Sequence, residues 1–435
     1  MERPGDHLDE LTIDAPGAEE VHVVPWPMML RQRVHGRFSS SPRYPWVVLA
    51  VSLFGLFSVG FTITILSVSV PRIADELNSD ASTVTWVVTG PLLAFAVVGP
   101  AMGKLGDLYG HRRLYTWSMA FVSVFALLTA AAWTAGALIA FRILGAATGA
   151  AVGPASIALI NRLFPPERRV QAMGYWSMVG AGGPVIGVVA GGPIVETFGW
   201  RWIFVAQAPL TLAGLVLGLL VLPETDRRDR VRFDWAGAGI LAVGATSLLF
   251  AINRGPGFGW SHPAIVAGFA IAPVAVVVFG VVERRVAHPL LPLRYVRRRN
   301  FSFAIATHAF TNFAYMGGFI ITPLFLEGEF GYPETRIGGL MIARPLAFSI
   351  AGPLAGYLAV RVGERASALA GAAFVAVSML ALSTVEPGSS DLIIMGSLAL
   401  SGIGLGCCSP ALAASIANAV DEQDLGVAGA FQQMM

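Results

Sequence analysis

The clearest shortage in this sequence is charge. Only 13% of its 435 residues are charged, while 55% are hydrophobic; a soluble domain carries about 25% charged residues. Because charged groups are costly in hydrocarbon, this deficit excludes an ordinary soluble protein and indicates a membrane protein. The net charge of +2 gives no electrostatic reason to expect a nucleic acid as a partner.

Cysteine and lysine are almost absent as well. The two cysteines, Cys407 and Cys408, are adjacent inside an apolar run, which is typical of small buried residues and not of a disulfide framework or a zinc site. We therefore expect no metal and no cofactor. Lys104 is the only lysine among the 29 lysines and arginines, and this bias indicates a GC-rich, bacterial genome.

The first 45 residues differ from the rest. Residues 1–20 are acidic and contain no hydrophobic core segment, so no signal peptide is expected. Residues 21–45 are basic. We predict a disordered cytoplasmic tail over 1–45; the alternative is a short helix that rests on anionic lipid headgroups.

Long apolar runs fill the remaining chain. A helix needs about 20 apolar residues to cross a bilayer, and its backbone groups must all bond within the segment. We therefore predict an all-α polytopic membrane protein. Its twelve expected spans are 46–70, 83–103, 114–132, 137–160, 171–194, 202–222, 235–252, 263–282, 301–326, 337–360, 366–384 and 392–416.

The loops predict the orientation of these spans. With the N-terminus in the cytoplasm, 23 of the 29 lysines and arginines fall in the tail and the inner loops, and four fall in outer loops. Positive residues concentrate on the cytoplasmic side. We therefore predict a multi-pass protein of the bacterial cytoplasmic membrane with its N-terminus in the cytoplasm.

An internal repeat relates two parts of the chain. Residues 99–113, "GPAMGKLGDLYGHRR", match residues 352–365, "GPLAGYLAVRVGER", at a shift of 253, which pairs Gly103 with Gly356. The copies follow the second and the tenth span. Repeated halves are typical of secondary transporters, and eight helices between the copies indicate two extra helices between the halves.

The repeat also concerns the end of the sequence. A shift of 256 pairs Pro154 with Pro410 and Ala172 with Ala428, so residue 435 corresponds to the opening of the fifth span. We therefore expect a fragment that lacks about two spans. A natural twelve-span protein is the alternative.

The stretch "GKLGDLYGHRR", residues 103–113, concentrates charge and glycine between the second and third spans. Its glycines let helices and backbone approach closely. Asp107 can pair with an arginine such as Arg112, or accept hydrogen bonds at a neighbouring helix end. This predicts a latch on the cytoplasmic side, the alternative being an ordinary positively charged loop. The expected latch residues are Gly103, Asp107, Gly110, Arg112 and Arg113.

This loop resembles the loop 2–3 signature of the major facilitator superfamily, G-x-L-x-D-x-x-G-x-R-R/K. "RILGAATGAAVGPA" (142–155) is similar to its fourth-helix arginine motif, and "GAGGPVIGVVAGG" (180–192) to its fifth-helix antiporter motif. "SVPRIADEL" (69–77) and "WRWIF" (200–204) resemble flanks of the fourteen-span drug:proton antiporter family. The resemblance covers residues 44–435.

The resemblance implies two six-helix bundles with an inserted helix pair. The expected divisions are an N-terminal bundle at 46–222, a linker with two extra spans at 223–300 and an incomplete C-terminal bundle at 301–435. It also associates the fifth helix with export, while helix packing alone is the alternative. The residues expected to carry this motif are Gly180, Gly183, Pro184 and Gly187.

Acidic residues are missing from the interior of all twelve predicted spans. The family often has an aspartate in the first span that is taken as part of proton coupling, and Thr62 occupies that position. Proton antiport needs a group that titrates within the membrane. His308 is one candidate, the alternative being a histidine at a helix interface; Glu196, Glu327, Glu329 and a group beyond residue 435 are others.

Two arginines lie within predicted spans instead. An arginine at mid-span costs about 2.5–3.5 kcal/mol on insertion scales, which indicates a water-lined cavity and a partner. Arg142 matches the fourth-helix arginine of the family. Arg344 could instead pair with Glu327 or Glu329. We predict an electropositive cavity formed by Arg142, Arg344, Thr62 and His308, which accepts neutral or anionic amphiphiles.

The sequence contains no Walker loop and no enzyme signature, so we expect neither ATP-driven transport nor catalysis. The predicted function is secondary export of hydrophobic or amphipathic small molecules by alternating access, as in multidrug exporters, coupled to protons by resemblance. The expected partners are the substrate, membrane lipids and the proton, and the expected state is a monomer. A metabolite importer or uniporter of the same fold, and a non-transporting lipid-handling or envelope-organising protein, are the alternatives.

Overall fold

A computed structural model describes residues 41–62, 66, 70–225, 233–286, 289–290 and 292–434. Of the predicted tail, residues 1–40 lie outside this range. The described residues form helices and no strand. The helices are α2 (Tyr44–Gly60), α4 (Val70–Glu76), α5 (Ala81–Val84), α6 (Trp86–Tyr109), α7 (His111–Ala130), α8 (Ala135–Gly149), α9 (Val152–Leu163), α10 (Pro166–Phe198), α11 (Arg201–Val221), α12 (Trp235–Phe258), α13 (Pro263–Glu283), α14 (Arg299–Gly328), α15 (Glu334–Met341), α16 (Ala343–Val362), α17 (Glu364–Ser383), α18 (Asp391–Asn418), η2 (Glu422–Asp424) and α19 (Leu425–Met434).

Ten helical stretches of the described chain are long and apolar enough to cross a membrane, and α2 is a shorter apolar helix. Together with α10, they overlap the twelve predicted spans. Many large apolar side chains on them face outward; Phe313 is 79% exposed and Val276 is 67% exposed. Such faces are stable only against lipid tails. The structure is therefore that of an all-helical polytopic membrane protein.

Two predicted spans are broken in a way that the sequence analysis did not predict. The span at 137–160 consists of α8 and α9, and the span at 337–360 consists of α15 and α16. Each break lies about one turn before a proline, Pro154 or Pro345. Proline lacks a backbone N–H, and its ring clashes with the carbonyl four residues earlier. Within the predicted first span, 46–70, helix α2 ends at Gly60, and residues 63–65 and 67–69 lie outside the described part of the chain.

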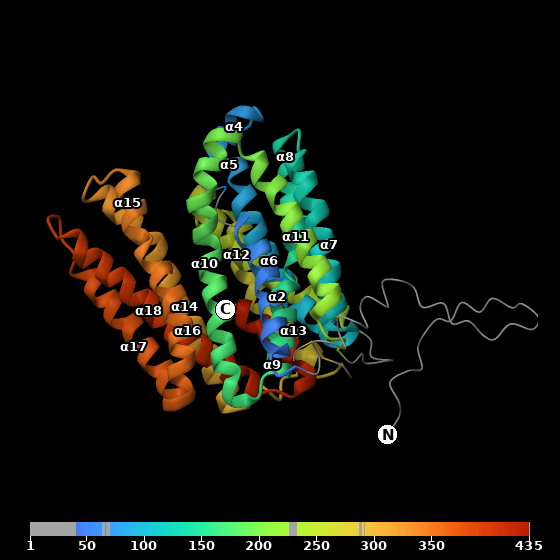
Figure 1. The fold of residues 1–435 in the computed structure, drawn as a ribbon. Coiled ribbons are helices and arrows are strands. Elements are labelled where there is room, and N and C mark those ends of the chain that lie inside the picture. Colours follow the sequence, from blue (N-terminus) through green and yellow to red (C-terminus); the bar gives the residue numbers. More distant parts are fainter. Residues whose placement is uncertain are drawn as a thin grey trace, which may run out of the picture.

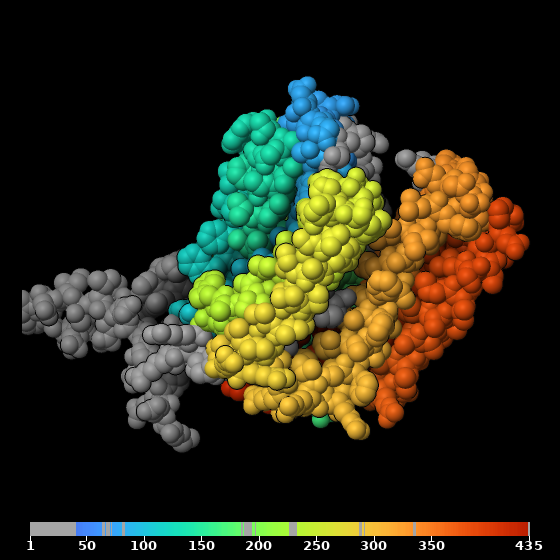
Figure 2. Space-filling model, turned by 180° about the vertical axis from the view of Figure 1, so that it is seen from behind, coloured from blue at the N-terminus to red at the C-terminus, as the bar shows by residue number. Residues whose placement is uncertain are grey.

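The helices form two groups that meet at one end. Helices α2 to α11 are the N-terminal group and α14 to α18 are the C-terminal group; they meet at the lower end of Figure 1, where α9 lies, and diverge toward α4 and α15 at the upper end. Helices α12 and α13 pack mainly on each other and on α6. Figure 2 shows them from behind, in yellow-green and yellow, between the N-terminal group and α14.

Two helix crossings join the groups at the lower end: α10 packs against α16, and α19 packs against α6. Repeat-related glycines make both crossings possible. A Cβ added to Gly356 would lie 2.9 Å from the carbonyl oxygen of Val170 on α10, and one added to Gly103 would lie still closer to the carbonyl oxygen of Gly426 on α19. The repeat in the sequence is therefore also a repeat in packing.

We expect Gly103→Ala to open the lower end, because the added methyl overlaps a backbone carbonyl that can move only with α19. Overpacking of this kind costs about 1–3 kcal/mol. A spin-label distance between α6 and α19 should lengthen or broaden. The matched control is Gly99→Ala on the same helix, whose added Cβ would meet no atom within 4 Å. An unchanged distance in Gly103→Ala would contradict the prediction.

Candidate gate and interior polar sites

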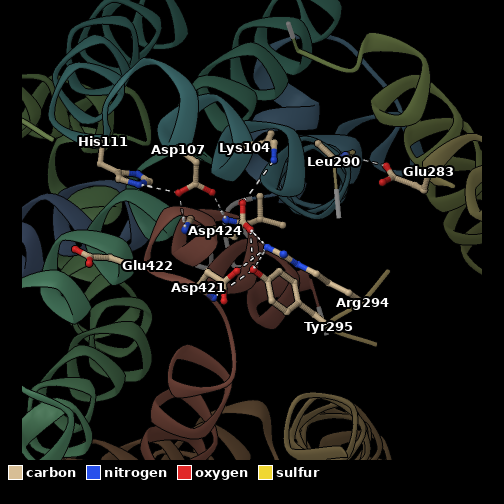
Figure 3. Close-up of polar contacts among 12 residues, drawn as sticks. Lys104, Asp107, His111, Glu283, Leu290, Arg294, Tyr295, Asp421, Glu422 and Asp424 are labelled. Atoms are coloured by element: carbon tan, nitrogen blue, oxygen red, sulfur yellow. Dashed lines mark hydrogen bonds and ion pairs between the residues drawn. The ribbon is translucent and has the colours of Figure 1, made fainter. Parts of the chain in front are cut away.

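Asp107 lies near the end of α6 and is 2% exposed. Its Oδ1 accepts a hydrogen bond from the backbone N–H of Gly426, and its Oδ2 accepts one from Val427, both with N to O distances of 3.0 Å. These groups belong to the first turn of α19, where the helix dipole favours a negative charge. Of the two kinds of partner predicted, Asp107 thus has a neighbouring helix end, and it links α6 to α19 (Figure 3).

His111 begins α7 and is completely buried beside Asp107. Its Nε2 lies 3.0 Å from Asp107 Oδ1, and its backbone N–H donates to Oγ1 of Thr225. Two glycines make room for the ring: a Cβ on Gly106 would lie 2.5 Å from His111 Nδ1, and one on Gly426 would lie 2.6 Å from Cε1. The imidazole is therefore enclosed between α6 and α19. The sequence analysis did not predict this role for His111.

Three of the predicted latch residues, Gly110, Arg112 and Arg113, act within the N-terminal group. Gly110 has φ of 99°, which a residue with a side chain rarely adopts, and so allows α6 and α7 to follow each other directly. Arg112 donates to Glu224 and, at 2.6 Å, to the carbonyl oxygen of Leu219. Arg113 Nε lies 3.5 Å from Glu224 Oε1. The two arginines therefore tie the start of α7 to the end of α11.

A second polar connection joins α6 to the segment before α19. Lys104 Nζ lies 3.7 Å from Asp424 Oδ1, and both side chains are less than 5% exposed. Asp424 Oδ2 also accepts a hydrogen bond from the hydroxyl of Tyr295 at 2.8 Å. Elsewhere at the lower end, Arg169 of α10 donates to Oδ1 of Asn418 at 2.6 Å. Besides the bonds of Asp107, the contacts of Lys104 and Arg169 thus help to hold the lower end closed.

Arg142 on α8 lies inside the N-terminal group and is 8% exposed. Its Nη2 donates to the carbonyl oxygen of Thr62 at 3.3 Å and its Nε to that of Val87 at 3.4 Å, while the guanidinium lies 5.3 Å from the centre of the Phe204 ring. Gln207 on α11 donates to Oγ1 of Thr62 at 3.1 Å. The structure thus brings Arg142 and Thr62 together and adds Gln207, which the sequence analysis missed.

A cavity of about 30 Å³ lies beside this group, and Thr62, Arg142, Phe204 and Gln207 are part of its lining. A volume of this size holds water. None of the described residues that line it is acidic. The charge of Arg142 is therefore balanced there by backbone carbonyls and an aromatic face rather than by a carboxylate.

Arg344 and His308 lie in the C-terminal group and do not join this cavity. Arg344 on α16 is fully buried, with its guanidinium 4.2 Å from the centre of the Tyr315 ring on α14. Its three side-chain nitrogens have no hydrogen-bond partner among the described residues, and no ion pair with Glu327 or Glu329 is found there. His308, on the same helix as Tyr315, is 6% exposed. Of the four predicted cavity residues, the structure therefore brings together Arg142 and Thr62 and does not add Arg344 or His308 to them.

The glycine-rich helix α10 contacts both groups. Gly183 is buried against Phe57 of α2 and Phe61, which follows that helix, while a Cβ on Gly182 would lie 3.2 Å from Oγ of Ser349 on α16. Gly180 is exposed. The surroundings of Pro184 and Gly187 lie outside the described part of the structure. Helix α10 runs without a break from Pro166 to Phe198.

The arrangement of the helices and of the buried charges indicates the class of protein. Helices that cross a membrane, two groups that close at one end only, and charged groups buried between and inside them are typical of a membrane transporter. The fold agrees with a solved structure, that of the human organic anion transporter MFSD10, with a TM-score of 0.63 and 16% identity over 91% of each chain.

The chain belongs to the Major Facilitator Superfamily, whose sequence profile matches residues 52–435. It is 28% identical to the tetracenomycin C resistance and export protein of Streptomyces glaucescens, over 89% of this chain and 72% of that protein. It is 30% identical to the multidrug resistance protein Stp of Mycobacterium tuberculosis, over 88% of this chain and 71% of that protein.

Proposed function

We propose that this protein exports hydrophobic or amphipathic small molecules from a bacterial cell by alternating access. The observation that carries the proposal is its similarity, over most of its length, to proteins named for resistance to and export of antibiotics. The transporter family and the membrane-spanning helices support a small-molecule substrate within a lipid bilayer. We also propose that the protein completes this transport cycle as a monomer.

The orientation is part of the proposal. The lower end carries the arginines of the α6–α7, α9–α10 and α16–α17 connections, and cytoplasmic loops are rich in such residues. We therefore assign the lower end to the cytoplasm. The conformation described here, with the two groups in contact at that end and divergent at the other, is then the outward-facing one (Figure 1).

In this cycle the contacts of Asp107 with α19 form the cytoplasmic latch, with Gly103 and Gly110 allowing the close approach of the backbone. Arg112 and Arg113 hold α7 to α11 so that the N-terminal group moves as a unit. We propose that Gly180, Gly183, Pro184 and Gly187 act in export by letting α10 pack closely against its neighbours and bend during the cycle.

Substrate chemistry follows from the charges. Arg142 and Arg344 are buried in the described interior. The described residues that line the cavity beside Arg142 include no carboxylate. An electropositive interior favours neutral or anionic amphiphiles over cations. Proton coupling, if carried by this chain, does not use a first-span carboxylate, because Thr62 occupies that place and is bonded to Gln207; His308 remains the titratable group that we propose for it.

Export from cells tests the proposal. Cells that express the protein should expel a neutral or anionic dye, and a protonophore should stop the export. Arg142→Ala should abolish it, and His308→Ala should remove its dependence on the proton gradient.

Uptake instead of export in oriented vesicles would indicate an importer or uniporter. No flux in proteoliposomes would indicate a non-transporting protein, and full export after the gradient collapses would exclude proton drive.

A further inference from the structure

The connection between α13 and α14 reaches into the closed lower end. Tyr295 lies in this connection and yet is only 1% exposed. Its hydroxyl donates to Asp424 Oδ2 at 2.8 Å and accepts from the backbone N–H of Asp421 at 3.2 Å (Figure 3). Burial, together with the hydrogen bond to Asp424, raises the pKa of Tyr295 to about 12. At neutral pH the hydroxyl therefore keeps the proton that it donates.

Two arginines hold the same connection in place. Arg294 pairs with Asp421 at 2.6 Å, and Arg298 donates to the carbonyl oxygen of Ala419 at 2.7 Å. Both guanidinium groups lie over the Tyr295 ring, 4.9 Å and 5.0 Å from its centre. Residues 292–298, which we call the arm, are thus fixed to residues 419–424, the segment that leads into α19.

The arm is also joined to the inserted helices and to α6. Tyr295 packs in one apolar cluster with Phe279 of α13, Leu290 and Leu108 of α6. Glu283, at the end of α13, accepts a hydrogen bond from the backbone N–H of Leu290 at 3.0 Å. The arm therefore shares one apolar cluster with the end of α13 and with α6, the helix that carries Asp107.

Asp424 is the point where these parts meet. It lies between Tyr295 of the arm and Lys104 of α6, and it is 3% exposed. A buried carboxylate is stable only where hydrogen bonds and opposite charges compensate it. Lys104 lies one turn before Asp107 on α6, so the chain of contacts from Tyr295 through Asp424 to Lys104 runs beside the latch.

We infer that the arm is a third component of the latch and that Tyr295 is a positioning residue in it. Tyr295 holds Asp424 where Lys104 reaches it, so the inserted helix pair takes part in closing the cytoplasmic end. This inference rests on the proposed alternating-access function. It assigns to α12–α13 a task in the transport cycle, beyond that of a spacer between the two groups.

The test uses the single lysine as a reporter. An amine-reactive reagent can modify only Lys104 and the terminal amine, which peptide mass spectrometry separates, and Lys104 is 3% exposed while the lower end is closed. In the full-length protein in lipid vesicles, Tyr295→Phe should raise the rate of Lys104 modification about ten-fold or more, because a hydrogen bond to a charged group is lost. The control is Tyr109→Phe, the same change at a residue 54% exposed on the same end.

Arg298→Gln provides a second variant at an exposed position, which keeps the test valid if Tyr295→Phe folds poorly. It should also raise the rate of Lys104 modification, by less than Tyr295→Phe does.

In both variants, transport should show a changed turnover with unchanged substrate affinity. A merely structural defect would instead lower the amount of folded protein and leave the turnover of the remaining protein unaltered. Modification of Lys104 at the wild-type rate in both variants would overturn the inference. Lys104 modification needs no substrate, so the two failures can be told apart. Faster labelling without drug export would contradict the proposed export function, while the part of the arm in closing the lower end would still be supported.

Discussion

Asp107→Asn should reduce drug export at least ten-fold. The carboxylate accepts backbone N–H groups of both Gly426 and Val427 and lies beside the His111 ring. An amide keeps one acceptor oxygen and places its NH₂ against the positive start of α19. Each hydrogen bond to a buried charge contributes about 1.5–3 kcal/mol. The closed conformation of the lower end is therefore destabilised relative to the open one, and the transport cycle should stall inward-facing.

The matched control for this change is Asp391→Asn. Asp391 pairs with Arg336 at the opposite end of the molecule, where both side chains are more than a third exposed. Efflux from cells, corrected for the amount of protein in the membrane, should be near normal in the control. Lys104 modification should rise in Asp107→Asn and not in Asp391→Asn. Normal export by Asp107→Asn would show that the bonds to α19 are not a latch.

Arg344→Met should raise thermal stability and abolish export together. The guanidinium is fully buried, and its nitrogens have no hydrogen-bond partner among the described residues. An arginine within the bilayer costs about 2.5–3.5 kcal/mol on insertion scales, whereas methionine fills irregular apolar space without charge. Opposite effects on stability and function are typical of a charge retained for binding.

Melting of the purified protein and efflux from cells measure the two effects. Arg361→Met on the same helix is the control, since Arg361 is exposed at the lower end, and it should change neither quantity much. A lower melting temperature for Arg344→Met would mean that the guanidinium has a strong partner outside the described residues. Unchanged export would exclude Arg344 from the substrate path.

Much of this architecture can be predicted from the sequence, for identifiable reasons. The cost of unpaired backbone groups in lipid turns each apolar run into a helix. The spacing of Gly103, Asp107 and Gly110 identifies the loop, and the repeat pairs Gly103 with Gly356. The crossing that Gly356 makes with α10 was not predicted. The breaks near Pro154 and Pro345 could also have been predicted, because proline acts on the carbonyl one turn earlier.

The partners of the charged groups could not be predicted in the same way. Asp107 bonds to residues 319 and 320 positions later in the chain, and Tyr295 to one 129 positions later. Nothing local to Gly426, Tyr295 or Gln207 marks them as partners, since a backbone N–H or a neutral side chain leaves no charge pattern in the sequence. Arg142 was predicted as a cavity residue, but its contacts arise only once α2, α6 and α11 surround it.

The two crossings at the lower end differ in kind. The repeat that pairs Gly103 with Gly356 pairs Asp107 with Val360, so the α10–α16 crossing has no carboxylate at that place and depends there on close backbone contact. A change at Asp107 therefore acts on one crossing alone. We expect the lower end to open first between α6 and α19, with the α10–α16 crossing as the pivot.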